Sequence, residues 1–89
     1  MAIEAKLQNK IRKSLKRMGW LVTKHILVSM NGWPDLEAIK EKRTIRIEVK
    51  APGKKLRPLQ EYAHEQIRNH GGEVYTVDSW EDYLKLNLK

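Results

Sequence analysis

Three residues in the middle of the chain have the side chains of a metal-assisted hydrolytic centre. They are Asp35, Glu48 and Lys50, with twelve residues between the first two and one between the last two. Hydrolysis of a phosphodiester requires an attacking water and neutralisation of charge on the transition state, and carboxylate oxygens that hold Mg²⁺ supply both. A lysine beside them can orient or deprotonate the water and offset the charge of the phosphate. These residue types therefore indicate phosphodiester hydrolysis.

The spacing of these residues fits two neighbouring strands of a β-hairpin. Glu48 and Lys50 are two positions apart, so on a strand their side chains leave the same face, about 7 Å apart. Asp35 begins the preceding strand, and a register that pairs the start of one strand with the end of the next brings its carboxylate beside Glu48. The backbone carbonyl of Val49 is an expected further metal ligand. The hairpin would thus bring the side chains of Asp35, Glu48 and Lys50 together.

Each part of this pattern has an ordinary explanation when it is taken alone. A Pro-Asp dipeptide such as Pro34-Asp35 is common in turns, and a Glu-x-Lys segment on a solvent-facing strand is usually a surface charge pair. Here both occur in one basic chain, together with a hairpin that would bring them side by side. The combination favours the hydrolytic interpretation over two unrelated features.

The charge of the chain indicates a polyanionic partner. Eighteen lysines and arginines against eleven acidic residues give a formal net charge of +7. Such an excess fits nucleic acid or an acidic membrane surface. Residues 1–24 contain seven basic residues and one acid, Glu4, whereas residues 73–89 are acidic to neutral. The basic surface is therefore expected mainly in the N-terminal half.

The elements that must position the centre follow from hydrophobic periodicity. Apolar residues at steps of three and four predict a helix over residues 3–18, ended by Gly19. The remaining predicted elements are strands over 20–28, 35–39, 44–50 and 73–78, a helix from Pro58 to Gly71-Gly72, and a short helix after Ser79. The order is α-β-β-β-α-β-α in one domain, residues 1–89. The predicted buried stripe of the second helix is Leu59, Tyr62, Ala63, Gln66 and Ile67.

Two groups of basic side chains are candidates for contacts with phosphates. One forms a stripe on the first helix, for which an ordinary solvated face is the alternative, and the other lies next to the predicted centre. The first group is Lys6, Lys10, Lys13 and Arg17, and the second is Lys54, Lys55 and Arg57. Trp33 could stack on a base, although an aromatic residue beside a turn often serves packing alone.

The pattern resembles the VRR-NUC branch of the PD-(D/E)XK nuclease superfamily over most of the chain. Residues 32–36, Gly-Trp-Pro-Asp-Leu, resemble its G-x-P-D-L element, and Glu48-Val49-Lys50 resembles its E-V-K element. Leu56 and Gln60 are similar to the L-x-x-x-Q that opens its next helix. The Val-Arg-Arg triplet that names the family is absent, and Arg57-Pro58 stands where many members have a Ser or Thr cap. Neither departure touches the expected metal ligands.

This resemblance implies a restriction-endonuclease-like α-β-β-β-α-β core, which is an α/β fold with a mixed sheet flanked by helices. It implies that Asp35 and Glu48 bind Mg²⁺ or Mn²⁺ and that Lys50 is catalytic. It also implies that Glu4 reaches the same metal and that Gln60 contacts the site or the scissile strand. The alternative for Glu4 is an acid that merely suits the helix dipole, and for Gln60 a solvated polar residue.

The expected function is that of a Mg²⁺- or Mn²⁺-dependent endonuclease that acts on structured DNA. Stand-alone members of the family resemble dimeric junction-resolving enzymes, which implies branched DNA such as a four-way junction and a homodimer. A non-catalytic nucleic-acid-binding module of the same fold is the alternative, and the three intact residues of the centre argue against it. A basic amphipathic helix at a membrane surface would leave the strand-borne charges unexplained.

The absence of cysteine excludes disulfides and thiolate metal sites and fits a reducing compartment. The charged N-terminal segment lacks the apolar stretch of a secretory signal, and no apolar run has the length of a membrane span. We therefore expect a cytoplasmic protein without a membrane partner, located in the host cytoplasm if a phage encodes it.

Overall fold

A four-stranded mixed sheet forms the centre of the computed structural model, which describes residues 3–89. The helices and strands are α1 (Ile3–Arg17), β1 (Leu21–Lys24), β2 (Leu36–Lys40), β3 (Arg43–Val49), α2 (Pro58–Asn69), β4 (Glu73–Val77) and α3 (Trp80–Lys85). The strand order is β1-β2-β3-β4, with antiparallel pairs β1–β2 and β2–β3 and a parallel pair β3–β4. The predicted element order and the mixed sheet flanked by helices are confirmed.

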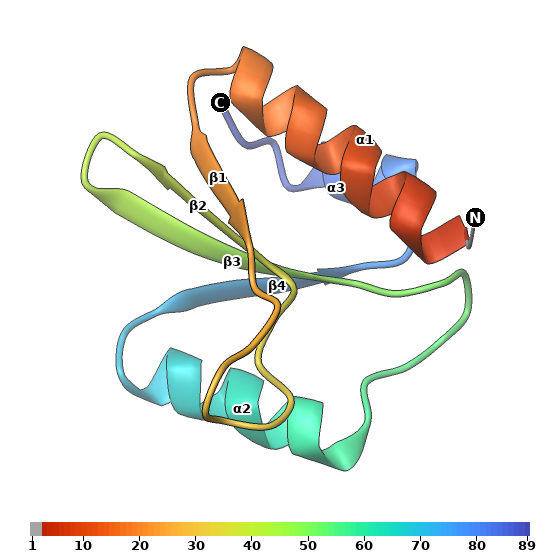
Figure 1. Cartoon of the computed structure of the whole chain (residues 1–89), viewed down its shortest axis with the longest axis vertical. Helices are drawn as coiled ribbons and strands as arrows, with labels where there is room; N and C mark the ends of the chain where they lie inside the picture. Colours follow the sequence, from red (N-terminus) through yellow and green to blue (C-terminus); the bar gives the residue numbers. More distant parts are fainter. Residues whose placement is uncertain (1–2) are drawn as a thin grey trace.

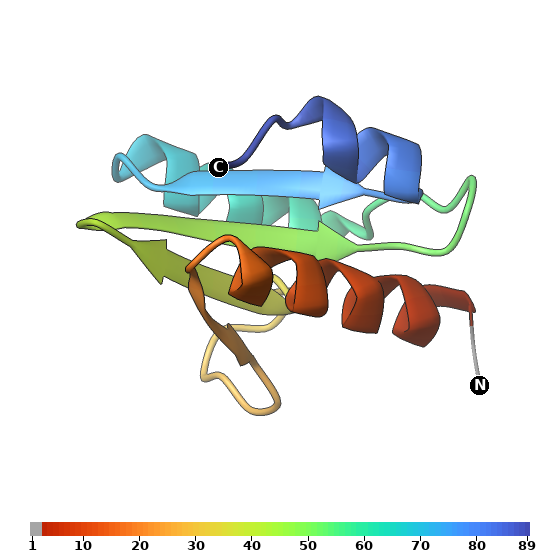
Figure 2. The same ribbon diagram turned by 90° about the horizontal axis from the view of Figure 1, so that it is seen from above.

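The helices cover opposite faces of this sheet (Figures 1 and 2). Helices α1 and α3 pack together on one face, and α2, which connects the parallel strands β3 and β4, lies on the other. No helix within residues 3–89 has both the length and the apolar composition needed to cross a membrane.

The hairpin of β2 and β3 has the register that the site requires. Its two-residue turn consists of Glu41 and Lys42, whose φ angles of 48° and 70° fit a turn that matches the twist of the strands. Leu36 pairs with Ile47, so the residue before β2, Asp35, comes next to the end of β3. The predicted pairing of one strand's start with the other's end is therefore present.

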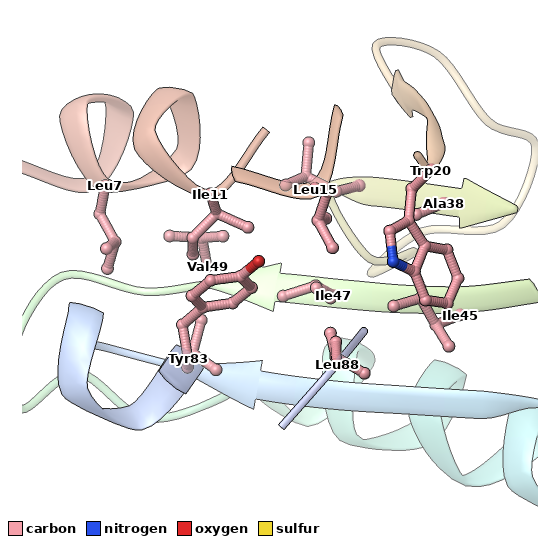
Figure 3. Close-up of a cluster of buried hydrophobic side chains, with 12 residues drawn as sticks. Leu7, Ile11, Leu15, Trp20, Ala38, Ile45, Ile47, Val49, Tyr83 and Leu88 are labelled. Carbon is pink, nitrogen blue, oxygen red and sulfur yellow. The ribbon is translucent and has the colours of Figure 1, made fainter. Parts of the chain in front are cut away.

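The core lies between β3 and the helices α1 and α3 (Figure 3). Ile45, Ile47 and Val49 alternate along β3 and are buried against Ile11 and Leu15 of α1. Burial of such side chains contributes about 1.5–3 kcal/mol each. Since a slip by one residue would turn all three towards the opposite face, this burial fixes which face of β3 carries Glu48.

The predicted first strand over residues 20–28 is wrong in its second half. Strand β1 ends at Lys24, and Leu27 is 94% exposed. Lys24 pairs with Leu36, the first residue of β2. Pro34 lies two residues before Leu36 and has no N–H that could extend the hydrogen-bonded ladder. The remaining predicted bounds match the observed ones or differ from them by one or two residues.

The predicted buried stripe of α2 is wrong for two residues. Leu59 and Tyr62 are 58% and 56% exposed, whereas Ala63, His64 and Ile67 are buried. The sheet face beneath α2 carries polar side chains of β3, so the inward side of the helix includes His64 in place of the bulkier apolar residues.

Candidate active site

Asp35 is held directly against the end of β3. Its Oδ2 accepts a hydrogen bond of 2.9 Å from the backbone N–H of Val49. Its own carbonyl accepts the N–H of His25 at 2.7 Å, which ties the residue to the chain that leaves β1. Both contacts fix the carboxylate beside the strand that carries Glu48.

The second carboxylate, Glu48, is almost completely buried, with 2% of its surface exposed. Burial raises its pKa, and the charge of Glu4 raises it further, whereas Asp35 and Lys50 lower it. Burial likewise raises the pKa of Asp35, to about 6, against the hydrogen bond from Val49. The structure therefore brings two acidic groups together in surroundings that disfavour their charge.

Lys50 directly follows the last residue of β3 and is hydrogen-bonded to a side chain of α2. Its Nζ donates a hydrogen bond of 3.0 Å to Oε1 of Gln60, and that oxygen also accepts the N–H of Arg57 at 2.9 Å. The N–H of Lys50 donates to the carbonyl of Val77 on β4, at 2.9 Å. Gln60 thus joins the lysine to the first turn of the helix.

Glu4 comes from the opposite side of the sheet. It is half-buried in the first turn of α1, whose N-terminal end lies at the same end of the molecule as the end of β3 (Figure 2). Its charge contributes to the raised pKa of Glu48. Glu4 is therefore close enough to influence the centre electrostatically.

His64 is a neighbour of the centre that the sequence did not single out. It is fully buried on α2, and its Nε2 lies 3.8 Å from Oε1 of Glu48, too far for a hydrogen bond. Burial, followed by the charge of Arg68, lowers its pKa, which keeps the ring neutral. The spacing could have revealed it, since Gln60 and residue 64 are one helical turn apart.

The donor atoms of the centre fit a hard divalent cation. Oε1 of Glu48 is buried and has no hydrogen-bond partner within residues 3–89, and both carboxyl groups have raised pKa values. Residues 3–89 contain no group of three His, Cys, Asp or Glu side chains placed to hold a metal. Mg²⁺ commonly uses one or two carboxylates together with waters and substrate phosphates, so Asp35 and Glu48 suit it.

Comparison with known proteins identifies the family. The model of the VRR-NUC domain matches residues 1–80. The chain belongs to the VRR-NUC family. A solved structure described as a VRR-NUC domain is 29% identical, with a TM-score of 0.87 over 94% of this chain and 92% of the other. A second, a VRR-NUC domain protein, shares the fold at 18% identity, with a TM-score of 0.79 over 97% and 85%. No curated protein matches.

VRR-NUC membership has direct consequences for the fold and the general activity. The family is PD-(D/E)XK nuclease-like, so the restriction-endonuclease-like fold expected from the sequence is confirmed. The chain carries a nuclease-fold domain, and this domain implies nuclease activity with DNA as the substrate. Nucleases of this kind are generally dependent on a divalent metal.

The glycine of the G-x-P-D-L element in this VRR-NUC domain has a steric role. Gly32 has a φ of +81°, and a Cβ there would overlap the carbonyl group of Leu59 and lie 2.7 Å from the backbone nitrogen of Gln60. Only a residue without a side chain allows this approach. The loop before Asp35 therefore packs closely against the first turn of α2, which also contains Gln60.

The predicted phosphate-binding side chains lie at different distances from the centre. Lys54, Lys55 and Arg57 are exposed on the loop between β3 and α2, at the same end of the molecule as the start of α1. Lys6, Lys10, Lys13 and Arg17 are exposed along α1. With a helical rise of 1.5 Å per residue, Arg17 lies about 16 Å beyond Lys6, at the far end of the helix. The loop and the first half of α1 are thus nearest to the centre.

Proposed function

We propose that this VRR-NUC protein is an endonuclease that requires Mg²⁺ or Mn²⁺ and hydrolyses phosphodiester bonds of DNA. The observation that carries the proposal is the meeting of Asp35, Glu48 and Lys50 at one end of the hairpin, with the carboxylate of Asp35 bonded to the N–H of Val49. A structural pair of surface charges would have no reason to be buried.

Each side chain has a role that follows from its position. Asp35 and Glu48 would hold the cation, with Glu4 and the carbonyl of Val49 as further oxygen donors. A bound Mg²⁺ or Mn²⁺ would supply Lewis-acid stabilisation of the phosphate and a water of lowered pKa. Lys50, steered by Gln60, is placed to orient the attacking water and to offset negative charge on the phosphate.

The proposed substrate is branched DNA such as a four-way junction, cut by a homodimer. The exposed lysines and arginines on α1 and on the loop before α2 support binding to several phosphates at once. Two centres related by two-fold symmetry would suit a symmetric junction. Sedimentation of the purified protein measures the oligomeric state, and a monomer at cleavage-competent concentrations would contradict the dimer.

Cleavage assays on three DNA structures test the proposal. The protein is incubated with a four-way junction, a duplex and a single strand, with Mg²⁺, Mn²⁺ or EDTA. We expect metal-dependent cleavage, strongest on the junction, and its loss in Asp35→Asn and Lys50→Ala. Glu65→Gln, which changes an exposed acid on the outer side of α2, is the matched control and should cleave like the parent.

Two results would contradict the proposal in different ways. If Asp35→Asn and Lys50→Ala cleave as well as the parent, the centre lies elsewhere. If the parent and both variants bind DNA and none of them cleaves it with either metal, the domain is a non-catalytic nucleic-acid-binding module.

A further inference from the structure

We propose that the cavity between Trp33 and the last two turns of α2 binds a single unpaired nucleobase of the DNA substrate. The cavity measures about 330 Å³. It is separate from Asp35, Glu48 and Lys50, which do not line it. The inference rests on the proposed function, because it deepens how that function selects its DNA.

The walls of the cavity offer flat and apolar surfaces. Met30, Trp33 and Ile67 line it, and the guanidinium of Arg46 lies 5.6 Å from the centre of the Trp33 ring. Indole rings and guanidinium planes both stack on nucleobases, and such stacking tolerates any base because every base has a π face. A planar heterocycle therefore suits this lining better than an aliphatic ligand.

The polar atoms of the cavity fit the edge of a base better than a phosphate. Arg46 forms an ion pair with Glu37 at 3.3 Å, which offsets its charge. Gln66 adds an amide to the lining. The offset charge of Arg46 and the amide of Gln66 favour a neutral polar partner such as a base carbonyl or ring nitrogen over a phosphate.

A glycine keeps the floor of the cavity open. A Cβ on Gly72 would lie 2.6 Å from Cγ2 of Ile67 and 3.3 Å from Nη1 of Arg46. A side chain at residue 72 would therefore require Ile67 or Arg46 to move, and both of these residues line the cavity. The volume is at the small end of the range for ligand sites, and it accommodates a single base.

The cavity is near enough to the centre for one DNA strand to serve both. Arg46 and Glu48 share a face of β3 about 7 Å apart, and Trp33 precedes Asp35 by two residues. A strand advances about 3.4 Å per nucleotide in a duplex. A nucleotide one or two steps from the scissile phosphate can therefore reach the cavity if its base is unpaired, as at a branch point.

Binding of bulged DNA in EDTA tests this pocket without cleavage. Two duplexes are compared, one with a bulged base and one with an abasic nucleotide at the same position. We expect the parent to bind the base-bearing duplex about tenfold more tightly, in keeping with the contribution of one stacked base. Trp33→Ala and Arg46→Met should lose this preference, and Trp33→Phe should retain most of it. Tyr62→Ala, an exposed aromatic residue of α2 outside the cavity, should behave like the parent.

The outcomes separate this inference from the proposed nuclease function. Equal binding of the two duplexes by a parent that cleaves DNA overturns the pocket and leaves the nuclease standing. A base preference that depends on Trp33, in a protein that cleaves nothing, supports the pocket and overturns the nuclease. If Trp33→Ala instead converts a dimer into a monomer in the absence of DNA, a second copy covers the cavity and the inference is wrong.

Discussion

The ammonium group of Lys50 and the side-chain oxygen of Gln60 are joined by a hydrogen bond of 3.0 Å. The same oxygen accepts the N–H of Arg57 at the start of α2, so one amide oxygen serves both a lysine of the candidate centre and a helix terminus. We therefore expect a link between stability and activity through this single atom, since the group that caps the helix also holds the lysine.

Replacement of Gln60 by leucine should lower both the unfolding free energy and the rate of DNA cleavage. Loss of the helix cap and of the partner of Lys50 is expected to cost about 1–3 kcal/mol of unfolding free energy. Cleavage should fall as well, because Lys50 would no longer be steered. Urea unfolding and single-turnover cleavage measure the two effects. Gln60→Glu, which retains the acceptor oxygen, should preserve the cap, and equal losses in both variants would contradict this link.

The raised pKa of Asp35 predicts a pH-dependent stability of the metal-free protein. An aspartate in the unfolded chain has a pKa of about 3.9, against about 6 in the folded protein, so the folded state binds the proton more tightly. The resulting stability is complete below about pH 4 and is lost as the pH rises through about 6. Glu48 shifts in the same direction.

This effect can be isolated by comparison with Asp35→Asn in EDTA. The Tm of the parent minus that of the variant should decrease from pH 4 to pH 7, because asparagine has no charge to desolvate. The subtraction removes groups of opposite behaviour such as Glu73, whose pKa Arg43 lowers to about 2. A difference that is constant with pH would contradict a partly buried Asp35 carboxylate with a raised pKa.

Mg²⁺ or Mn²⁺ should stabilise the parent at pH 7 by offsetting the negative charge of the desolvated Asp35 and Glu48 carboxylates. A ligand present at a hundred times its Kd adds about 2.7 kcal/mol to the stability of a protein that binds it only when folded. Thermal unfolding should show this increase in the parent and in the exposed control Glu81→Gln, and little of it in Asp35→Asn or Glu48→Gln. The same increase in all four proteins would place the metal elsewhere.

Gly32 and Gly53 form a matched pair for testing the close approach of the loop to α2. Their φ angles are +81° and +76°, but a Cβ at Gly53 meets nothing within 4 Å. Gly53→Ala should therefore cost about 1–2 kcal/mol, the penalty of a left-handed conformation alone. Gly32→Ala adds the overlap with Leu59 and should cost clearly more. Chemical denaturation measures both, and equal losses would show that the loop moves away easily.

His64→Leu should leave the metal-free protein close to the parent in stability. Both ring nitrogens of His64 are buried without hydrogen-bond partners among residues 3–89, so their removal relieves a desolvation cost that offsets the change in packing. Leucine also fills most of the space. A loss of more than about 2 kcal/mol in urea unfolding would mean that the ring has a partner such as an ordered water.

The sequence predicted the parts of this molecule that depend on alternation. Ile45, Ile47 and Val49 mark one face of β3 as core, and the opposite face must then carry Glu48; the hairpin register follows from the position of Asp35. A local pattern is sufficient wherever each residue's direction is set by its neighbours in the chain.

The predictions that were wrong depend on what a segment packs against. Residues 25–28 have strand-forming side chains, but β2 has no residues left to pair with them. Tyr62 looked like a buried position, yet the inward face of α2 includes His64 because the sheet beneath it is polar. Whether such a segment pairs or buries a given residue depends on the surface that packs against it. The spacing of residues within the segment carries no information about that surface.

The alternation of Glu48 and Val49 also restricts how the hairpin can change in length. Insertion of one residue into β3 before Glu48 would exchange the two faces, so that the Glu48 carboxylate would enter the apolar layer and Val49 would enter the candidate centre. Insertions within the Glu41-Lys42 turn leave both strands in phase. The turn is therefore the place where related chains can lengthen this hairpin, and where a reporter peptide could be inserted without disturbing the nuclease fold.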